Sequence, residues 1–177
     1  RGGVVKDGGS WSWGGHTRAV VFAPMVHWPE GRGGYEGGER VLFSADGFGG
    51  CGAVAKFDEN ADWASEARRY YLNIVGKYGP QVQALLKKAA ALDIATICPL
   101  HGPVLTGDLG KYLAYYDTWS SYKPEEPEQI LVARASIHGH TRAAAHTMAA
   151  KLRAKGAKVG EMDLTRTEAP HALTRAF

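Results

Sequence analysis

Short apolar runs bounded by turn residues recur in the first hundred residues and predict β-strands. Runs of this kind occupy residues 17–25, 40–45 and 94–98. Before them, an Asp7-Gly8-Gly9 turn separates Val4-Val5-Lys6 from Trp11-Ser12-Trp13, which predicts a β-hairpin. Residues 30–39 are rich in glycine, with Tyr35 in the middle, and predict a surface loop.

Apolar residues at spacings of three and four predict three helices. The first begins at Asn60 or Asp62 and ends at the Gly79-Pro80 break. The second covers residues 81–92. The third covers residues 109–122, where tyrosines and tryptophans at helical spacing predict packing into a core. Strands, then a helical pair, then a strand indicate a layered α/β domain with its site at strand ends.

A change of composition divides the chain. Residues 123–128, Lys-Pro-Glu-Glu-Pro-Glu, have the composition of an inter-domain linker. After it, residues 130–133 and 158–164 predict strands on either side of an alanine-rich helix over residues 142–155, which is the start of a doubly wound parallel sheet. We therefore expect one domain over residues 1–122, a linker over 123–128 and part of a second domain over 129–177.

Composition narrows the class of protein. The chain has 177 residues, of which 45% are hydrophobic and 22% charged, with a net charge of +3 spread along its length. These values are typical of a globular protein and give no indication of nucleic-acid binding. There is no apolar run of the roughly 18 residues that a membrane span needs. Two cysteines, Cys51 and Cys98, without a Cys-x-x-Cys motif favour a reducing cytoplasmic location.

Three polar residues at the ends of apolar runs are candidate metal ligands. Asp46 follows the run over residues 41–45, and a carboxylate at the tip of a buried strand is costly unless a cation or donor meets it. His27 and His101 follow similar runs and lie near prolines. Each residue alone has a structural explanation, as a hydrogen-bonded histidine or a turn-forming aspartate. Together they suit a transition metal, and Asp46 can bridge two ions.

A second candidate site lies between the predicted strand and helix that follow the linker. This turn is polar and contains a glycine, so it presents backbone N–H groups at a positive helix end, which suits a phosphate. His138 and His140 also allow a metal site, but no acidic partner follows closely. The turn consists of Ser136, Ile137, His138, Gly139, His140 and Thr141.

Five segments, in order, resemble the motifs of flavodiiron proteins, also called A-type flavoproteins. The resemblance covers nearly the whole chain. It implies the C-terminal part of a metallo-β-lactamase-like αββα sandwich, followed by the start of a flavodoxin-like doubly wound parallel sheet. The segments are Pro-Met-Val-His-Trp-Pro-Glu at 24–30, Leu-Phe-Ser-Ala-Asp-Gly-Phe-Gly at 42–49, Arg-Tyr-Tyr-Leu-Asn-Ile at 69–74, Cys-Pro-Leu-His-Gly-Pro at 98–103 and Ala-Ser-Ile-His-Gly-His-Thr at 135–141.

The resemblance also implies roles and partners. His27 and His101 would be iron ligands of a diiron centre, Asp46 the bridging carboxylate, and residues 136–141 the turn that holds the FMN phosphate. The implied activity is reduction of dioxygen to water or of nitric oxide to nitrous oxide, with electrons from a rubredoxin-like or flavin donor. A head-to-tail homodimer is expected.

One departure from the family is plain, because its His-x-Glu-x-Asp-His motif is absent. In the family this motif lies upstream of the His-Trp-Pro segment, so it is expected before Arg1, and the chain is expected to be a fragment that is inactive alone. Two alternatives stay open. One is a zinc-dependent hydrolase of the same fold, and the other is a non-catalytic FMN electron carrier.

Overall fold

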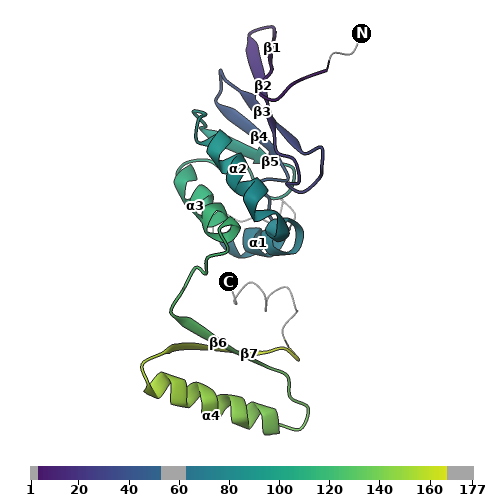
Figure 1. Ribbon diagram of the computed structural model, residues 1–177. Helices are drawn as coiled ribbons and strands as arrows, with labels where there is room; N and C mark the ends of the chain where they lie inside the picture. The colour runs from purple at the N-terminus through teal and green to yellow at the C-terminus, as the bar shows by residue number, and fades with distance from the viewer. Residues whose placement is uncertain (1–3, 53–62, 167–177) are drawn as a thin grey trace. The chain divides into compact units, whose positions relative to one another are not determined.

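The structure, a computed structural model, describes residues 4–52 and 63–166 (Figure 1). Two compact units divide the chain, the first over Arg1–Tyr122 and the second over Lys123–Phe177. Each unit is described by itself below. No helix among the described residues is both long and apolar enough to cross a membrane.

The first unit contains a five-stranded sheet in the order β1-β2-β3-β4-β5. The first four strands run antiparallel to their neighbours, and β5 runs parallel to β4. The strands are β1 (Ser10–Trp13), β2 (His16–Phe22), β3 (Arg32–Glu36), β4 (Val41–Ala45) and β5 (Thr96–Pro99).

The predicted N-terminal hairpin is wrong in its pairing. β1 pairs with β2 around Gly14 and Gly15, and Val4 is 99% exposed, outside any strand. The turn at Asp7 exists, but its carboxylate has another role. It accepts hydrogen bonds from the Phe22 N–H at 2.8 Å and from Lys88 Nζ at 2.7 Å. The hydrogen bond from Lys88 is the main reason why the pKa of Asp7 is lowered.

The glycine-rich segment predicted as a loop contains strand β3 instead. Gly33 and Gly34 lie within the sheet, and a Cβ at Gly33 would lie 2.5 Å from the Phe43 carbonyl oxygen. Tyr35 packs against the core, and its hydroxyl donates to the Asp93 carbonyl at 2.7 Å. Glycine allows the close approach of two strands here, which composition alone did not reveal.

Between β4 and β5 the chain forms a series of helices. They are α1 (Trp63–Tyr70), a π-helix η2 (Tyr71–Val75), a 3₁₀ turn η3 (Gly76–Tyr78) and α2 (Gly79–Ala89), and α3 (Leu109–Ser120) follows β5. The predicted helix start at Asn60 or Asp62 lies outside the described residues. The predicted helix up to Gly79 is confirmed from Trp63 onward, although its second half is π-helical and then 3₁₀.

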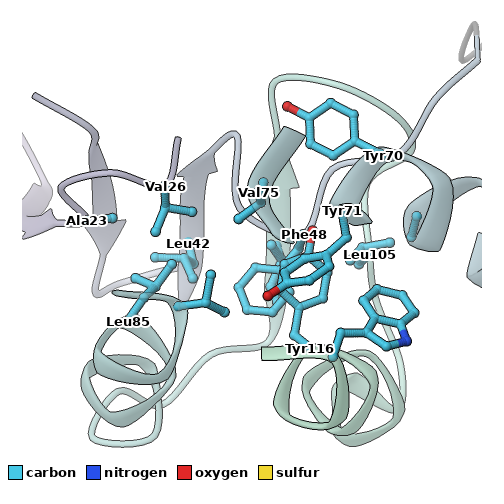
Figure 2. Close-up of a cluster of buried hydrophobic side chains, with 14 of the residues drawn as sticks. Ala23, Val26, Leu42, Phe48, Tyr70, Tyr71, Val75, Leu85, Leu105 and Tyr116 are labelled. Carbon is cyan, nitrogen blue, oxygen red and sulfur yellow. The ribbon is translucent and has the colours of Figure 1, made fainter. Parts of the chain in front are cut away.

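Helices α1, α2 and α3 lie on one side of the sheet (Figure 1). Between them and the sheet lies a single core that includes Leu42, Ile97 and Tyr116. Figure 2 shows Phe48, Tyr71 and Tyr116 lying together within this core. The predicted packing of aromatic residues from the third helix is therefore confirmed for Tyr116 and Trp119, which are 0% and 3% exposed.

The opposite side of the sheet has a different character. Phe43 follows the core residue Leu42 in β4, so its side chain points to this opposite side, and Trp11 lies opposite Arg18 in β1 and β2. Trp11 and Phe43 are 43% and 44% exposed, and the Arg18 guanidinium lies over the Phe43 ring at 5.8 Å. In the described part of the chain, helices cover one side of this sheet only.

The second unit is the βαβ element that the sequence predicts. Strands β6 (Gln129–Arg134) and β7 (Lys158–Asp163) pair in parallel, and helix α4 (His140–Ala154) connects them. Arg134 at the end of β6 forms an ion pair with Asp163 at the end of β7, with a distance of 2.9 Å between Nη1 and Oδ2.

Gly33→Ala should destabilise the first unit by about 1–3 kcal/mol, because the added methyl group meets the Phe43 carbonyl and forces β3 and β4 apart. Gly34→Ala is the matched control in the same strand, since its Cβ would meet nothing closer than 4.0 Å. The free energy of unfolding from urea titration measures both. Equal effects of the two substitutions would contradict the role given to Gly33.

Candidate metal centre

The three candidate ligands converge at one edge of the five-stranded sheet. Asp46 directly follows β4, and His101 follows β5 by two residues. Because these strands are parallel, with Leu42 opposite Ile97, their C-terminal ends meet at the same edge. His27 lies in the connection between β2 and β3.

Asp46 lies between the two histidines, and each carboxylate oxygen faces one of them. Asp46 Oδ2 is 3.6 Å from His27 Nε2, and Asp46 Oδ1 is 3.4 Å from His101 Nε2. These distances exceed those of a good hydrogen bond, about 2.7–3.2 Å. They suit ligand atoms that each lie about 2 Å from a shared ion, because such atoms surround the ion without bonding to each other.

His27, Asp46 and His101 alone do not form a complete metal site. Within residues 4–52 and 63–166, no group of three or more His, Cys, Asp or Glu side chains is arranged to hold a metal ion. The reason is visible in the geometry, because each oxygen of Asp46 has one histidine and no third donor. The carboxylate therefore lies between two histidines, with one near each of its oxygens.

Backbone strain gathers around these residues. Met25, Ala45 and Phe48 have φ values of 64°, 52° and 63°, which L-residues with side chains rarely adopt. Each lies within two residues of His27 or Asp46. Strained backbone persists where the surrounding structure holds it, and it is common at functional sites.

Hydrogen bonds between backbones fix the two loops that carry Asp46 and His101. The Leu100 N–H donates to the Ala45 carbonyl at 2.8 Å, and the Gly50 N–H donates to the His101 carbonyl at 3.1 Å. Gly102 has φ +87°, and a Cβ on it would lie 2.9 Å from the Gly50 nitrogen. The carboxylate and the histidine are thus positioned by one interlocked pair of loops.

The predicted phosphate turn lies at the N-terminus of α4. The Gly139 N–H donates to Ser136 Oγ at 3.0 Å, and Gly139 has φ +86°. Of the six predicted residues, Ser136, Ile137, His138 and Gly139 line a polar hollow of about 280 Å³. His140 and Thr141 are instead the first residues of the helix.

Sequence reasoning missed the charged residues around this hollow. Arg134, Arg142 and Arg166 line it together with Asp163 and Thr165. Arg134 and Arg142 flank the turn in sequence, so their proximity was a usable signal. Arg166 comes from beyond β7, and only the parallel pairing of β6 and β7 brings it near.

Known proteins match this chain over nearly its whole length. No family model matches it. The putative diflavin flavoprotein A 2 of Synechocystis is 28% identical over 92% of this chain and 28% of its own length. The nitric oxide reductase of Moorella thermoacetica is 29% identical over 88% of this chain and 40% of its own length.

Solved structures agree. The flavodiiron protein from Giardia intestinalis superposes with a TM-score of 0.87 and 25% identity, over 98% of this chain and 44% of that one. The chain is similar to flavodiiron proteins over nearly its whole length. Rubredoxin oxygen:oxidoreductase from Desulfovibrio gigas matches similarly, with a TM-score of 0.85 and 26% identity over 98% of this chain. The chain spans less than half the length of each of these relatives.

The predicted α/β fold class is thereby confirmed, with a metallo-β-lactamase-like sheet and helices in the first unit. The domain limits at residues 122 and 128 stay a prediction. So does the assignment of His27, Asp46 and His101 to metal and of residues 136–141 to FMN.

Tyr70 is a further residue beside the candidate ligands, and sequence reasoning treated it only as part of the core. Its ring centroid lies 5.7 Å from that of His101, and its hydroxyl is hydrogen-bonded to Asp46. Burial and then the negative charge of Asp46 raise the pKa of Tyr70, so the phenol keeps its proton at neutral pH. Helical spacing indicated its burial, but spacing could not reveal that it points at the carboxylate.

Gly102→Ala should reduce the metal bound by the full-length protein several-fold, because the new methyl group would push the His101 loop away from Gly50. Gly107→Ala is the matched control. Gly107 also has positive φ, at +73°, but no atom lies within 4 Å of its Cβ position. Metal content by elemental analysis measures the effect, and the unfolding midpoint should also fall more in Gly102→Ala, because only its methyl group meets the Gly50 backbone. Equal metal content in the two variants would contradict this role for Gly102.

Proposed function

We propose that this chain forms part of a flavodiiron oxidoreductase that reduces dioxygen to water, nitric oxide to nitrous oxide, or both. The observation that carries the proposal is the placement of Asp46 between His27 and His101, one histidine to each oxygen. The structural similarity to a flavodiiron protein over 98% of the chain supports the same proposal.

His27, Asp46 and His101 fit iron chemically. Neutral imidazole and carboxylate ligands suit both ferrous and ferric ions. Asp46 is 8% exposed, and a buried carboxylate between two histidines is stabilised by cations on both sides. When bound, a pair of irons would bind the diatomic gas and supply electrons to it.

The protein's own residues would hold and orient that pair. Asp46 would be shared by the two ions, and His27 and His101 would each be a ligand of one of them. The phenol of Tyr70 would donate its hydrogen bond to the carboxylate and keep one oxygen lone pair occupied. Three ligands do not complete a two-metal site, so the proposal requires more donors from outside the described residues.

The second unit would hold FMN by its phosphate. The Gly139 turn and the N-terminus of α4 present N–H groups, and three arginines add positive charge around the hollow. When bound there, FMN would supply electron transfer from a rubredoxin-like or flavin donor. A head-to-tail homodimer, in which the flavin of one subunit serves the irons of the other, belongs to the same proposal.

Iron content of the full-length protein tests the metal assignment. Purified protein should contain about two irons per chain, and Asp46→Asn should lose most of both, because the neutral amide is a poor bridge. His16→Gln is the control, since His16 contacts Glu36 and not Asp46. Zinc in place of iron, without flavin absorbance, would favour the hydrolase. Flavin without iron would favour the electron carrier.

FMN binding tests the phosphate turn separately. Arg142→Gln should weaken FMN binding about tenfold, or 1.4 kcal/mol, while leaving riboflavin binding unchanged, because riboflavin lacks the phosphate. Lys155→Gln, the same loss of charge at the other end of α4, is the matched control. Quenching of flavin fluorescence measures both ligands. Equal weakening of FMN and riboflavin would place the phosphate elsewhere.

A further inference from the structure

A set of tyrosines and tryptophans leads from the candidate metal centre toward the surface of α3. Figure 2 shows its inner part, in which Tyr71 and Tyr116 lie together beneath Tyr70. We call this set the aromatic path. It consists of Tyr70, Tyr71, Tyr116, Trp119, Trp63 and Tyr112.

Ring contacts connect the five members from Tyr71 to Tyr112, and Tyr70 joins them through its peptide bond to Tyr71. Tyr71 lies 5.2 Å from Tyr116 and 5.4 Å from Trp119, measured between ring centroids. Trp119 stacks on Trp63 at 6.4 Å with an interplanar angle of 20°. Trp63 meets Tyr112 edge to face at 4.6 Å. An electron can therefore pass from Tyr112 to Tyr71 through aromatic rings alone, by way of Trp63 and Trp119.

The two ends have different environments. At the inner end, Tyr70 is 8% exposed, touches His101 and precedes Tyr71 at the start of the π-helix. At the outer end, Tyr112 is only partly buried, and Lys111 Nζ lies 4.6 Å from the centroid of its ring. The path thus connects the carboxylate edge of the sheet with solvent.

Packing alone does not explain the residue types. The Tyr71 hydroxyl and Trp63 Nε1 are buried and have no hydrogen-bond partner among the described residues. A buried polar atom without a partner costs about 1–3 kcal/mol, so phenylalanine would fill the Tyr71 position at lower cost. Tyrosine and tryptophan differ from phenylalanine in giving up one electron far more easily. Easier one-electron oxidation is therefore a reason to have tyrosine at position 71 and tryptophan at position 63.

We propose that the aromatic path carries single electrons from Tyr112 to the candidate metal centre, and so removes oxidising equivalents left there when flavin electrons run short. The inference rests on the proposed function, because only an oxygen-reducing centre generates such equivalents.

The electrons and protons balance. Each inner residue gives one electron inward and receives one from its outer neighbour, so it is unchanged. Burial raises the pKa of Tyr71, which makes loss of its proton, and hence a lasting radical there, unfavourable. Tyr112 loses one electron inward and its phenol proton to water. An external thiol then returns a hydrogen atom to the Tyr112 phenoxyl, and two thiyl radicals combine to a disulfide.

A metal-free photochemical experiment tests the path itself. Leu100, 73% exposed and next to His101, is replaced by cysteine in a Cys51→Ser, Cys98→Ser background of the full-length protein. The new thiol carries a ruthenium polypyridyl complex. Light and a cobalt(III) quencher, which takes up the electron, create the oxidising equivalent beside the centre. A spin trap and peptide mass spectrometry then locate the radical.

The expected result is an adduct on Tyr112 that falls at least fivefold in Trp119→Phe and, independently, in Trp63→Phe. Tyr78→Phe is the matched control and should change nothing. Tyr78 is also half-buried beside a lysine, with Lys77 Nζ 4.9 Å from its ring centroid, but it is outside the path. An unchanged Tyr112 adduct in both tryptophan variants would overturn the proposal, as would an equally strong adduct on Tyr78.

The same variants in the iron-loaded protein separate this inference from the proposed function. After peroxide treatment, Trp119→Phe should accumulate several-fold more oxidation on the Tyr70 and His101 peptides than the unsubstituted protein. Protein that binds no iron would refute the proposed function, and the photochemical result would still decide whether the path conducts.

Discussion

The parallel pairing of β4 with β5 is the constraint on which the rest of the first unit depends. Parallel neighbours need a long crossover, and here the crossover is the helical segment from α1 to α2. The crossover brings the helices onto one side of the sheet and creates the core. The parallel pairing also places Asp46 and His101 together at the C-terminal ends of β4 and β5, although 55 positions separate them in sequence.

Local residue patterns were sufficient for much of this arrangement. Strands β4 and β5, helices α2 and α3, and the βαβ element of the second unit all follow from periodicity and from glycine and proline breaks. The meeting of His27, Asp46 and His101 was also predictable, because a polar residue after a buried strand needs a partner, and strand ends of an α/β sheet lie together.

The failures share a physical cause, which is that the deciding contacts come from distant residues. β3 looked like a loop because glycine weakens a strand, yet the neighbouring Phe43 carbonyl requires glycine at position 33. The Asp7 turn looked like a hairpin because local sequence does not reveal that its carboxylate accepts a hydrogen bond from Lys88, 81 positions later. The π-helix after Tyr70 and the third arginine of the phosphate hollow likewise depend on tertiary packing.

The sheet surface that carries Trp11 and Phe43 has a practical consequence. Exposed aromatic rings promote self-association in solution where they form an extended apolar patch. Here Arg18 lies opposite Trp11, and its guanidinium covers the Phe43 ring. The positive charge between the two rings therefore opposes face-to-face pairing of two copies of this sheet.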